Sequence, residues 1–311
     1  MISKTKEVNL NFKQFLLLLW SRKFIILFTT LFFIVVSISY ALYLPNEYRS
    51  QAVVKLSQQH NSDMSSIASQ YGGIAAAAGI DIPNSTSEKS ENLAIEIIKS
   101  REFFKHLLTY EGVLPEIMAA KRFNFDNQET IFDEKIYRPE KKEWVRKPEP
   151  PFGIIPSYLE AHEVYLNEIL TIFFDKKTNF ITISITHVSP VFAEEFLALI
   201  INELNRLERE TDLLKINKKL IYLEEQLNKF EIKGIQDSIF NIIETQLEKK
   251  MLTDISDEYF IEILDSPFIP EEKSSPQRSL IVILGSILGF IFSVTFIFLR
   301  NISNVKLETS L

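Results

Sequence analysis

Two uncharged apolar runs constrain this 311-residue chain more than any other feature. Phe24–Leu44 and Leu280–Leu299 contain no Asp, Glu, Lys or Arg. A helix rises about 1.5 Å per residue, so each run is long enough to cross a hydrocarbon core of roughly 30 Å. The sequence therefore predicts transmembrane helices at 24–44 and 280–299, which flank one large domain at 45–279 and leave short tails at 1–23 and 300–311.

The charges beside these runs predict the topology. The chain has a net charge of −7, the first 23 residues carry +4 and the last 12 carry +1, which leaves −12 for residues 45–279. Short segments rich in Lys and Arg stay in the cytoplasm during insertion. We therefore expect both termini in the cytoplasm and the acidic domain on the outer side of the membrane.

A cleaved signal peptide is the competing interpretation of the first run, with Ser37-Ile38-Ser39 as its cleavage site. The apolar stretch is longer than the 7 to 15 residues typical of such a segment. Its length favours an uncleaved anchor.

The sequence offers little catalytic chemistry. It has no cysteine, which excludes disulfides, Cys-ligated zinc and thiol nucleophiles. Its four histidines are scattered, and neither a Gly-x-Ser-x-Gly elbow nor a phosphate-binding Gly-x-x-x-x-Gly-Lys-Ser/Thr loop is present. His162 and Glu163 beside Glu160 are read as a solvated helix face. We expect no enzyme, no metal and no cofactor, and the −12 charge also argues against a nucleic-acid partner.

The pattern of the central domain predicts an α+β fold. Alternating apolar residues indicate strands at Tyr48–Leu56, Ile169–Phe174, Phe180–His187 and Glu258–Leu264. The first and last of these begin and end the domain, so they are expected to pair near the bilayer. A helix is predicted at Glu88–Tyr110, with Ser87 as its cap.

The longest helix is predicted at Val191–Phe230, because 40 residues follow Pro190 without Gly or Pro. Its apolar stripe is interrupted at Glu208–Asp212, where a step of six residues turns it by about 120°. In one interpretation the second half packs on another subunit; in the other, this is one core helix with a solvated middle. The residues of the second half that would form the oligomer seam are Leu213, Ile216, Leu220, Leu223 and Leu227. A shorter return helix is predicted at Ile235–Met251.

Two stretches are predicted to be surface loops. Met64–Ile82 holds Gly72-Gly73 and four successive alanines, and Glu140–Pro156 is rich in proline and charge around Trp144. Either could contact a partner, although a surface loop without a role is the more common case.

The approach to the second apolar run is the most specific stretch. Pro267, Pro270 and Pro276 keep the chain extended, so they predict a stiff spacer between a strand and the membrane. Gly285 and Gly289 then lie on one face of the predicted helix, where they permit close contact with another helix.

The sequence resembles the Wzz chain-length determinants, which are polysaccharide co-polymerases of the bacterial inner membrane. The resemblance covers nearly the whole chain. It is carried by the segment Leu44–Ser50 with Pro45, Tyr48 and Arg49, by Gly72-Gly73, by Glu96–Arg101, by Val188-Ser189-Pro190, by Ser256–Tyr259, and by Pro267, Pro270, Pro276 and Arg278 leading to Gly285 and Gly289.

This resemblance implies a non-enzymatic regulator of the length of a surface polysaccharide, with lipopolysaccharide O antigen as the commonest polymer of the family. It implies a ring of identical subunits, each with a small membrane-proximal α/β base and a long extended helix. The implied partners are a Wzy-type polymerase, its undecaprenyl-linked polysaccharide, the membrane and further copies of the chain.

Two alternatives remain. One is the capsule or exopolysaccharide branch of the same superfamily, which works with a separate tyrosine kinase; the 12 residues after the second run contain no tyrosine. The other is a two-span extracytoplasmic sensor, for which tails of 23 and 12 residues are too short to supply an output module.

Overall fold

The computed structural model describes residues 20–57, 86–227, 229 and 233–308, and the side chains of these residues except 86–90 and 301–308. The chain divides into two compact units, one formed by residues 1–46 and 275–311 and the other by residues 47–274. The predicted loop Met64–Ile82 lies entirely outside the described residues.

The first unit is a pair of packed helices, α2 (Lys23–Tyr43) and α10 (Arg278–Glu308). Both are long and apolar enough to cross a membrane, over 21 residues in α2 and over Arg278–Arg300 in α10. They coincide with the two apolar runs of the sequence. The chain therefore has the architecture of a two-span membrane protein with a central domain.

The second unit is built on an antiparallel sheet in the order β6-β7-β1-β8, with β9 also paired to β1. Its strands are β1 (Glu47–Leu56), β6 (Leu170–Asp175), β7 (Phe180–His187), β8 (Ile261–Asp265) and β9 (Lys273–Ser275). In β1 every second residue from Tyr48 to Leu56 is buried, which is the pattern of a strand with one face on a core. The predicted pairing of the first strand with the last is confirmed: Val54 lies opposite Ile263 on one side and Ile181 on the other.

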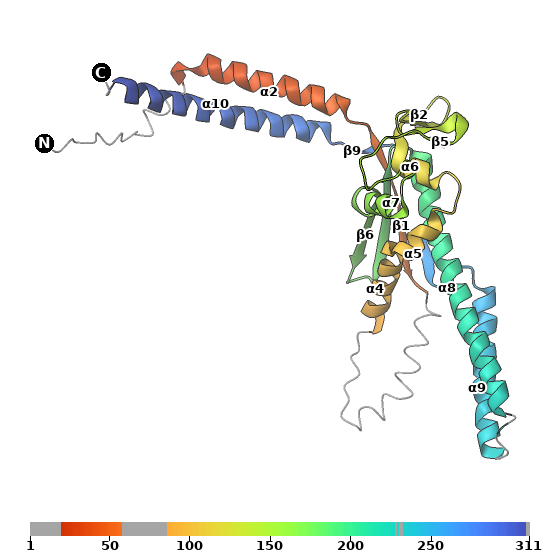
Figure 1. Ribbon diagram of the computed structural model, residues 1–311. Coiled ribbons are helices and arrows are strands. Elements are labelled where there is room, and N and C mark those ends of the chain that lie inside the picture. Colours follow the sequence, from red (N-terminus) through yellow and green to blue (C-terminus); the bar gives the residue numbers. More distant parts are fainter. Residues whose placement is uncertain (1–19, 58–85, 228, 230–232, 309–311) are drawn as a thin grey trace. The chain divides into compact units, whose positions relative to one another are not determined.

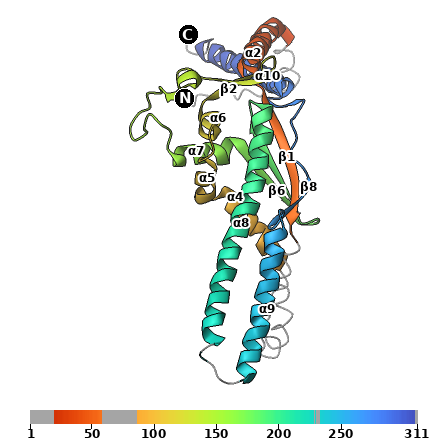
Figure 2. The same ribbon diagram turned by 90° about the vertical axis from the view of Figure 1, so that its right-hand side faces the viewer.

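Helices cover this sheet (Figures 1 and 2), and small hairpins are added to one side of the unit. The helices are α4 (Thr86–Lys99), α5 (Arg101–Leu107), α6 (Val113–Ala119), α7 (Tyr158–Val164), the π-helical turn η2 (Tyr165–Ile169), α8 (Pro190–Leu227) and α9 (Lys233–Ile255). The hairpins are β2–β3 (Ala120–Asn124, Glu129–Phe132) and β4–β5 (Tyr137–Arg138, Glu143–Trp144), the latter enclosing the 3₁₀ turn η1 (Pro139–Lys141). The core lies between the sheet, α4, α5, α7, η2 and the first part of α8.

The prediction of one continuous helix over Glu88–Tyr110 is wrong. The structure divides it at Ser100, whose backbone is extended and whose hydroxyl accepts a hydrogen bond from the Phe103 amide. Ser87, predicted as the cap, lies inside α4. The break turns α5 so that Phe103, Phe104 and Leu107 are buried.

The long helix α8 first packs on strands β1 and β7 and then runs beside α9 (Figure 2). The predicted solvated middle of α8 is confirmed in part. Glu210 and Thr211 are exposed, whereas Asp212 is buried and its carboxylate accepts a 2.8 Å hydrogen bond from the Tyr259 hydroxyl. Asn205 fixes the same junction: its amide donates to the Ile261 carbonyl and accepts from the Phe260 and Ile261 amides. These polar contacts satisfy the backbone where the chain passes from α9 into β8.

Candidate functional site

The predicted small-residue face of α10 packs on α2 of the same chain. A Cβ atom placed on Gly285 would lie 2.7 Å from the Ser37 Cβ, and one placed on Gly289 would lie 2.7 Å from the Phe33 Cβ. Real Cβ atoms do not approach so closely, so only glycine permits this contact. Within the single chain this face of α10 is therefore occupied by α2.

A hydrogen bond joins the beginning of α10 to the link that follows α2. Arg278 at the beginning of α10 donates a 2.9 Å hydrogen bond from Nη2 to Oδ1 of Asn46. Pro45 lies in the three-residue link after α2, and Pro276 lies between β9 and α10. One side-chain contact within the helical unit thus connects the segment after α2 to the first residue of α10.

Within the domain, the segment that contains Pro267 and Pro270 runs beside the beginning of β1. The Ser50 hydroxyl donates to the Phe268 carbonyl at 2.7 Å, and the Ser274 hydroxyl donates to the Glu47 carbonyl at 3.2 Å. The predicted extended spacer is therefore attached to the sheet, and part of it forms β9.

Tyr48 and Arg49 are held at the first residues of β1. The Tyr48 ring meets the Phe125 ring edge-on at 5.6 Å, and Arg49 Nε donates to the Thr186 hydroxyl at 3.2 Å. Both residues fix the domain at the end that follows the first membrane helix.

The predicted oligomer seam on α8 lies in part inside the α8–α9 hairpin. Ile216 and Leu220 are buried, while Leu213, Leu223 and Leu227 are half-buried. Other large apolar side chains of the hairpin stay exposed in the single chain: Leu214, Ile221 and Tyr222 on α8, and Phe240, Ile242, Leu247, Met251 and Ile255 on α9. An apolar hollow on α9 extends from Phe240 to Ile255. Exposed apolar surface of this extent is typical of a protein interface.

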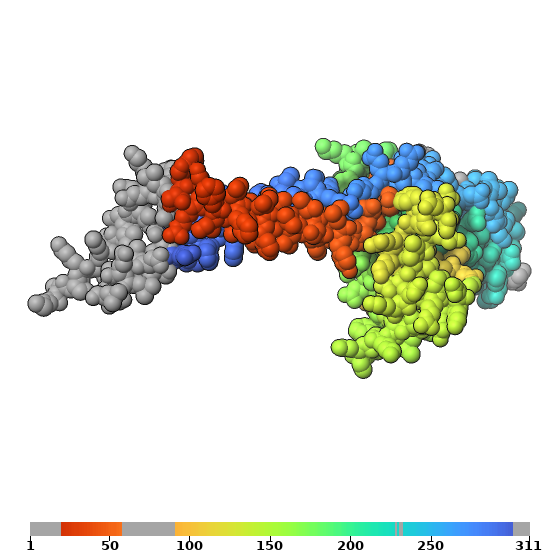
Figure 3. All heavy atoms as spheres, turned by 90° about the horizontal axis from the view of Figure 1, so that it is seen from above, coloured from red at the N-terminus to blue at the C-terminus, as the bar shows by residue number. Residues whose placement is uncertain are grey.

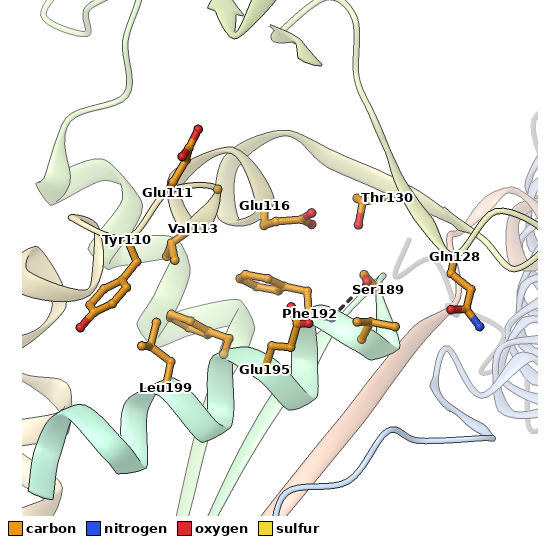
Figure 4. Close-up of a pocket in the computed structure, with 13 residues that line it drawn as sticks. Tyr110, Glu111, Val113, Glu116, Gln128, Thr130, Ser189, Phe192, Glu195 and Leu199 are labelled. Atoms are coloured by element: carbon orange, nitrogen blue, oxygen red, sulfur yellow. Dashed lines mark hydrogen bonds between the residues drawn. The ribbon is translucent and has the colours of Figure 1, made fainter. Parts of the chain in front are cut away.

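A separate cleft of about 450 Å³ lies between α6, the β2–β3 hairpin and the beginning of α8 (Figure 4). Its apolar wall includes Phe192 and Leu199. Polar groups around it come from three different segments: Tyr110, Glu111, Glu116, Gln128, Thr130, Ser189 and Glu195. This combination of an apolar wall and several hydrogen-bonding groups suits a polar organic ligand of modest size.

Glu116 is the most perturbed group of this cleft. Burial raises the pKa of its carboxyl to about 7, against the effect of a hydrogen bond with Thr130, and the charge of Glu195 adds to the rise. Beside it, His187 is buried, and its pKa is lowered to about 4 because burial disfavours the charged imidazolium. The His187 Nε2 atom lies 3.0 Å from the Glu116 carbonyl oxygen. Both side chains are therefore mainly neutral over much of the range between pH 4 and 7.

A second charged cluster ties α5 to α8. Glu203 receives a 2.6 Å contact from Arg206 Nη2 and lies 2.6 Å from Nε2 of His106. Burial would raise its pKa, but hydrogen bonds with Arg206, Tyr110 and His106 outweigh this and hold the pKa at about 2. The Glu203–Arg206 ion pair lies within α8, and the contact of Glu203 with His106 joins α8 to α5.

The remaining histidines make structural contacts. His162 Nε2 lies 2.8 Å from the Lys99 carbonyl oxygen, which joins α7 to the end of α4, and His60 lies outside the described residues. Within the described ranges, no three His, Asp or Glu side chains are grouped so that they could hold a metal ion. Sequence reasoning missed the Glu116 cleft because its parts are dispersed from Tyr110 to Leu199.

Comparison with known protein families gives two matches. Residues 8–110 match the model Wzz, chain length determinant protein, and residues 236–302 match GNVR, the G-rich domain on putative tyrosine kinase. The first match confirms the predicted resemblance over residues 8–110. The second covers α9, β8 and most of α10, including the proline-rich approach to the membrane.

Solved structures of polysaccharide co-polymerases are also similar to this chain. A full-length bacterial polysaccharide co-polymerase aligns over 93% of this chain and 97% of its own, with 13% identity and a TM-score of 0.38. A fragment of WzzB, a polysaccharide co-polymerase from Salmonella Typhimurium, aligns over 74% of this chain and 100% of its own, with 12% identity and a TM-score of 0.28. No curated protein matches the sequence.

Proposed function

We propose that this chain, whose residues 8–110 match the Wzz chain length determinant model, regulates the length of a surface polysaccharide without catalysing its synthesis. The preferred polymer is lipopolysaccharide O antigen. The chain would act as an oligomeric scaffold for a Wzy-type polymerase that extends an undecaprenyl-linked glycan. The observation that carries this proposal is the match of residues 8–110 together with the two apolar helices.

The proposed location is the bacterial inner membrane, with residues 45–279 in the periplasm and both tails in the cytoplasm. The net charges of +4 before the first span and +1 after the second support this orientation. Trp20 at one end of α2, and Tyr40 and Tyr43 at the other, are exposed aromatic residues at the two levels where membrane interfaces would lie.

The proposed homo-oligomer would form through the α8–α9 hairpin. Its exposed apolar residues supply a surface that the single chain leaves uncovered. The half-buried Leu213, Leu223 and Leu227 border this surface, whereas Ile216 and Leu220 would support it from inside the hairpin. The Glu116 cleft is our candidate for a weak contact with the growing glycan, because its hydrogen-bonding groups match sugar hydroxyls and its apolar wall matches a sugar ring face.

The test is a deletion of the gene followed by gel separation of every surface polysaccharide. We expect the modal length band of one polysaccharide to be replaced by a broad distribution, and a plasmid copy to restore the band. An unchanged length distribution for all of them would falsify the proposal.

A second candidate is the tyrosine-kinase-associated branch of the co-polymerases. The GNVR match at residues 236–302 favours it, since GNVR is a G-rich domain on putative tyrosine kinases. In this second candidate function the chain works with a separate tyrosine kinase in the synthesis of a capsule or exopolysaccharide.

The two candidates differ in what the deletion removes. The kinase-associated function predicts a loss of capsule or exopolysaccharide and the purification of a cytoplasmic tyrosine kinase with the tagged chain. The preferred function predicts an altered lipopolysaccharide ladder with no kinase in the purified complex.

A further inference from the structure

The Glu116 cleft carries acidic groups and no basic ones. The carboxyl groups of Glu111, Glu116 and Glu195 line it, and none of its described lining residues is Lys, Arg or His. Glu111 is paired with Lys142, so Glu116 and Glu195 are the carboxyl groups that face a ligand. Glu195, and Glu116 once it is ionised, would repel a ligand that brings a negative charge of its own.

His187 does not compensate for the Glu116 side chain. The Ser189 amide donates a 3.1 Å hydrogen bond to Nδ1 of His187, so the proton of the neutral ring is on Nε2. Nε2 donates to the Glu116 carbonyl oxygen and lies 3.9 Å from Oε2 of the side chain, beyond hydrogen-bond reach. Oε2 is buried and has no hydrogen-bond partner among the described residues. Because the side chain is 17% exposed and its terminal torsion is soft, a donor in the cleft can use this free hydrogen-bonding capacity.

The α8 wall of the cleft places a carboxylate between apolar groups. Val191, Glu195 and Leu199 are four residues apart, so they follow one row along the helix. Val191 and Leu199 are half-buried, which leaves part of each side chain to contact a ligand. A ligand that fits this row carries a hydrogen-bond donor next to a small apolar group.

The opposite wall supplies further hydrogen-bonding groups. Figure 4 shows Glu116 and Thr130 facing the residues of α8, and Gln128 in the β2–β3 turn also lines the cleft. Figure 3 shows this hairpin, in yellow, at the surface of the domain. Carboxyl, hydroxyl and amide oxygens all accept hydrogen bonds. Both walls therefore suit a ligand that is rich in hydroxyl groups and carries no negative charge.

We propose that this cleft binds an uncharged, N-acetylated sugar unit of the glycan and rejects acidic sugars. The acetamido N–H would donate to the Glu195 carboxylate while its methyl group packs against Val191 or Leu199. Ring hydroxyls would donate to Glu116 and Thr130. A sugar carboxylate or phosphate in the same place would be unpaired and repelled. The inference rests on the proposed function for the presence of a glycan, and it adds the class of sugar.

Three methyl glycosides separate these features in a direct binding test. They are the glycosides of N-acetylglucosamine, glucose and glucuronic acid, which differ in the acetamido group and in charge. Saturation-transfer difference NMR follows their binding to the full chain in lipid nanodiscs, with empty nanodiscs as the blank. We expect the strongest binding for the N-acetylglucosamine glycoside, with the largest signal at its acetyl methyl group, weaker binding for the glucose glycoside and the weakest for the glucuronic acid glycoside.

Glu195→Lys tests the charge of the cleft. Glu195 is exposed, so this substitution should leave the fold intact. It should raise the affinity for the glucuronic acid glycoside by about tenfold or more, because a repulsion becomes an attraction. Glu225→Lys makes the same change of charge at an exposed position in the second half of α8, and this matched control should leave the binding of all three glycosides unchanged.

Four results would overturn the inference. The glucuronic acid glycoside could bind as well as the N-acetylglucosamine glycoside, or the glucose glycoside could do so. The effect of Glu195→Lys could equal that of Glu225→Lys, or none of the three glycosides could bind. None of these results bears on the length distribution measured after deletion of the gene, so the proposed function is tested separately.

Discussion

The first half of α8 packs on β1 and β7, whereas the second half runs beside α9. The first half buries Phe196, Leu197, Ile200, Ile201 and Leu204, each no more than 1% exposed. The second half buries Ile216 and Leu220 but exposes Leu214, Ile221 and Tyr222. One continuous helix thus serves a folded core at one end and an uncovered apolar surface at the other. The first half of α8 therefore contributes mainly to the stability of the domain, whereas the second half offers the surface for the proposed assembly.

The largest expected effect is on the stability of the first half. Phe196 stacks on Phe192 at 5.1 Å and meets Tyr165 edge-on at 6.0 Å. Phe196→Ala should reduce the free energy of unfolding by about 3–5 kcal/mol, because it leaves a cavity in the core. Tyr222→Ala, at a 60% exposed position of the second half, should change it by no more than about 0.5 kcal/mol. Thermal unfolding of the full chain in detergent measures both, and similar losses would contradict the comparison.

The sequence predicted the elements in which one local signal dominates. β7 was predicted with its observed bounds, because strict alternation and a polar turn define it, and α8 was predicted because no Gly or Pro interrupts it. The hairpins β2–β3 and β4–β5 were missed. Their turns place Gln128 and Lys142 at φ of 53° and 50°, a conformation usually signalled by glycine or asparagine.

Tertiary contacts explain the other differences. The predicted last strand begins three residues too early, because Tyr259 turns to Asp212 and the Phe260 amide bonds to Asn205 before β8 starts. The glycines of α10 were identified as a contact face, but composition alone does not tell that α2 is the neighbour. The cleft around Glu116 joins residues that are far apart in sequence, so no local pattern could show it.

The next effect concerns the cleft beside the first half of α8, and it depends on pH. The pKa of Glu116 is about 7 in the folded chain and near 4.5 when unfolded. As the pH rises, Glu116 therefore loses its proton in the unfolded state before it does so in the folded state. The free energy of unfolding falls progressively from pH 4.5 to pH 7 for this reason. The free energy of unfolding of Glu116→Gln should therefore exceed that of the wild type by an amount that grows from pH 4.5 to pH 7 and reaches about 3 kcal/mol. Melting temperatures measured in buffers from pH 4.5 to 7.5 provide the check.

His187 is the control for that measurement, because its effect has the opposite sign. Its folded pKa of about 4 lies below the ordinary value of 6.5, so it raises stability as the pH increases from 4 to 6.5. In the wild type the two groups offset each other over the shared range. A difference between Glu116→Gln and the wild type that does not change with pH would show that the carboxyl is not perturbed.

A smaller effect is expected at Glu203, where the two halves of α8 meet. Its pKa of about 2 lies below the unfolded value, so its contacts with Arg206 and His106 stabilise the fold above pH 4.5 and are lost as the pH falls through 2. Glu203→Gln should lower stability at pH 7 by about 1–2 kcal/mol, since Arg206 is partly exposed and solvent weakens the pair. The difference from the wild type should shrink in acid. Equal losses at pH 7 and pH 3 would show that the carboxylate charge does not contribute.

The smallest effect on stability, and the most informative for the second half, is expected at Ile221. This side chain is 59% exposed on the α8–α9 hairpin, so Ile221→Ser should change the free energy of unfolding by no more than about 0.5 kcal/mol. If the exposed apolar residues pack against another copy of the chain, the same substitution removes part of that contact and should shift the purified protein toward smaller assemblies. Glu225→Ser, an exposed polar position one turn further along, is the matched control. Mass measurement of the full chain in lipid nanodiscs distinguishes the two variants. An assembly of unchanged size with Ile221→Ser would show that the exposed surface of the hairpin does not hold the copies together. The two halves of α8 would then differ only in how much of their apolar surface is buried within the chain.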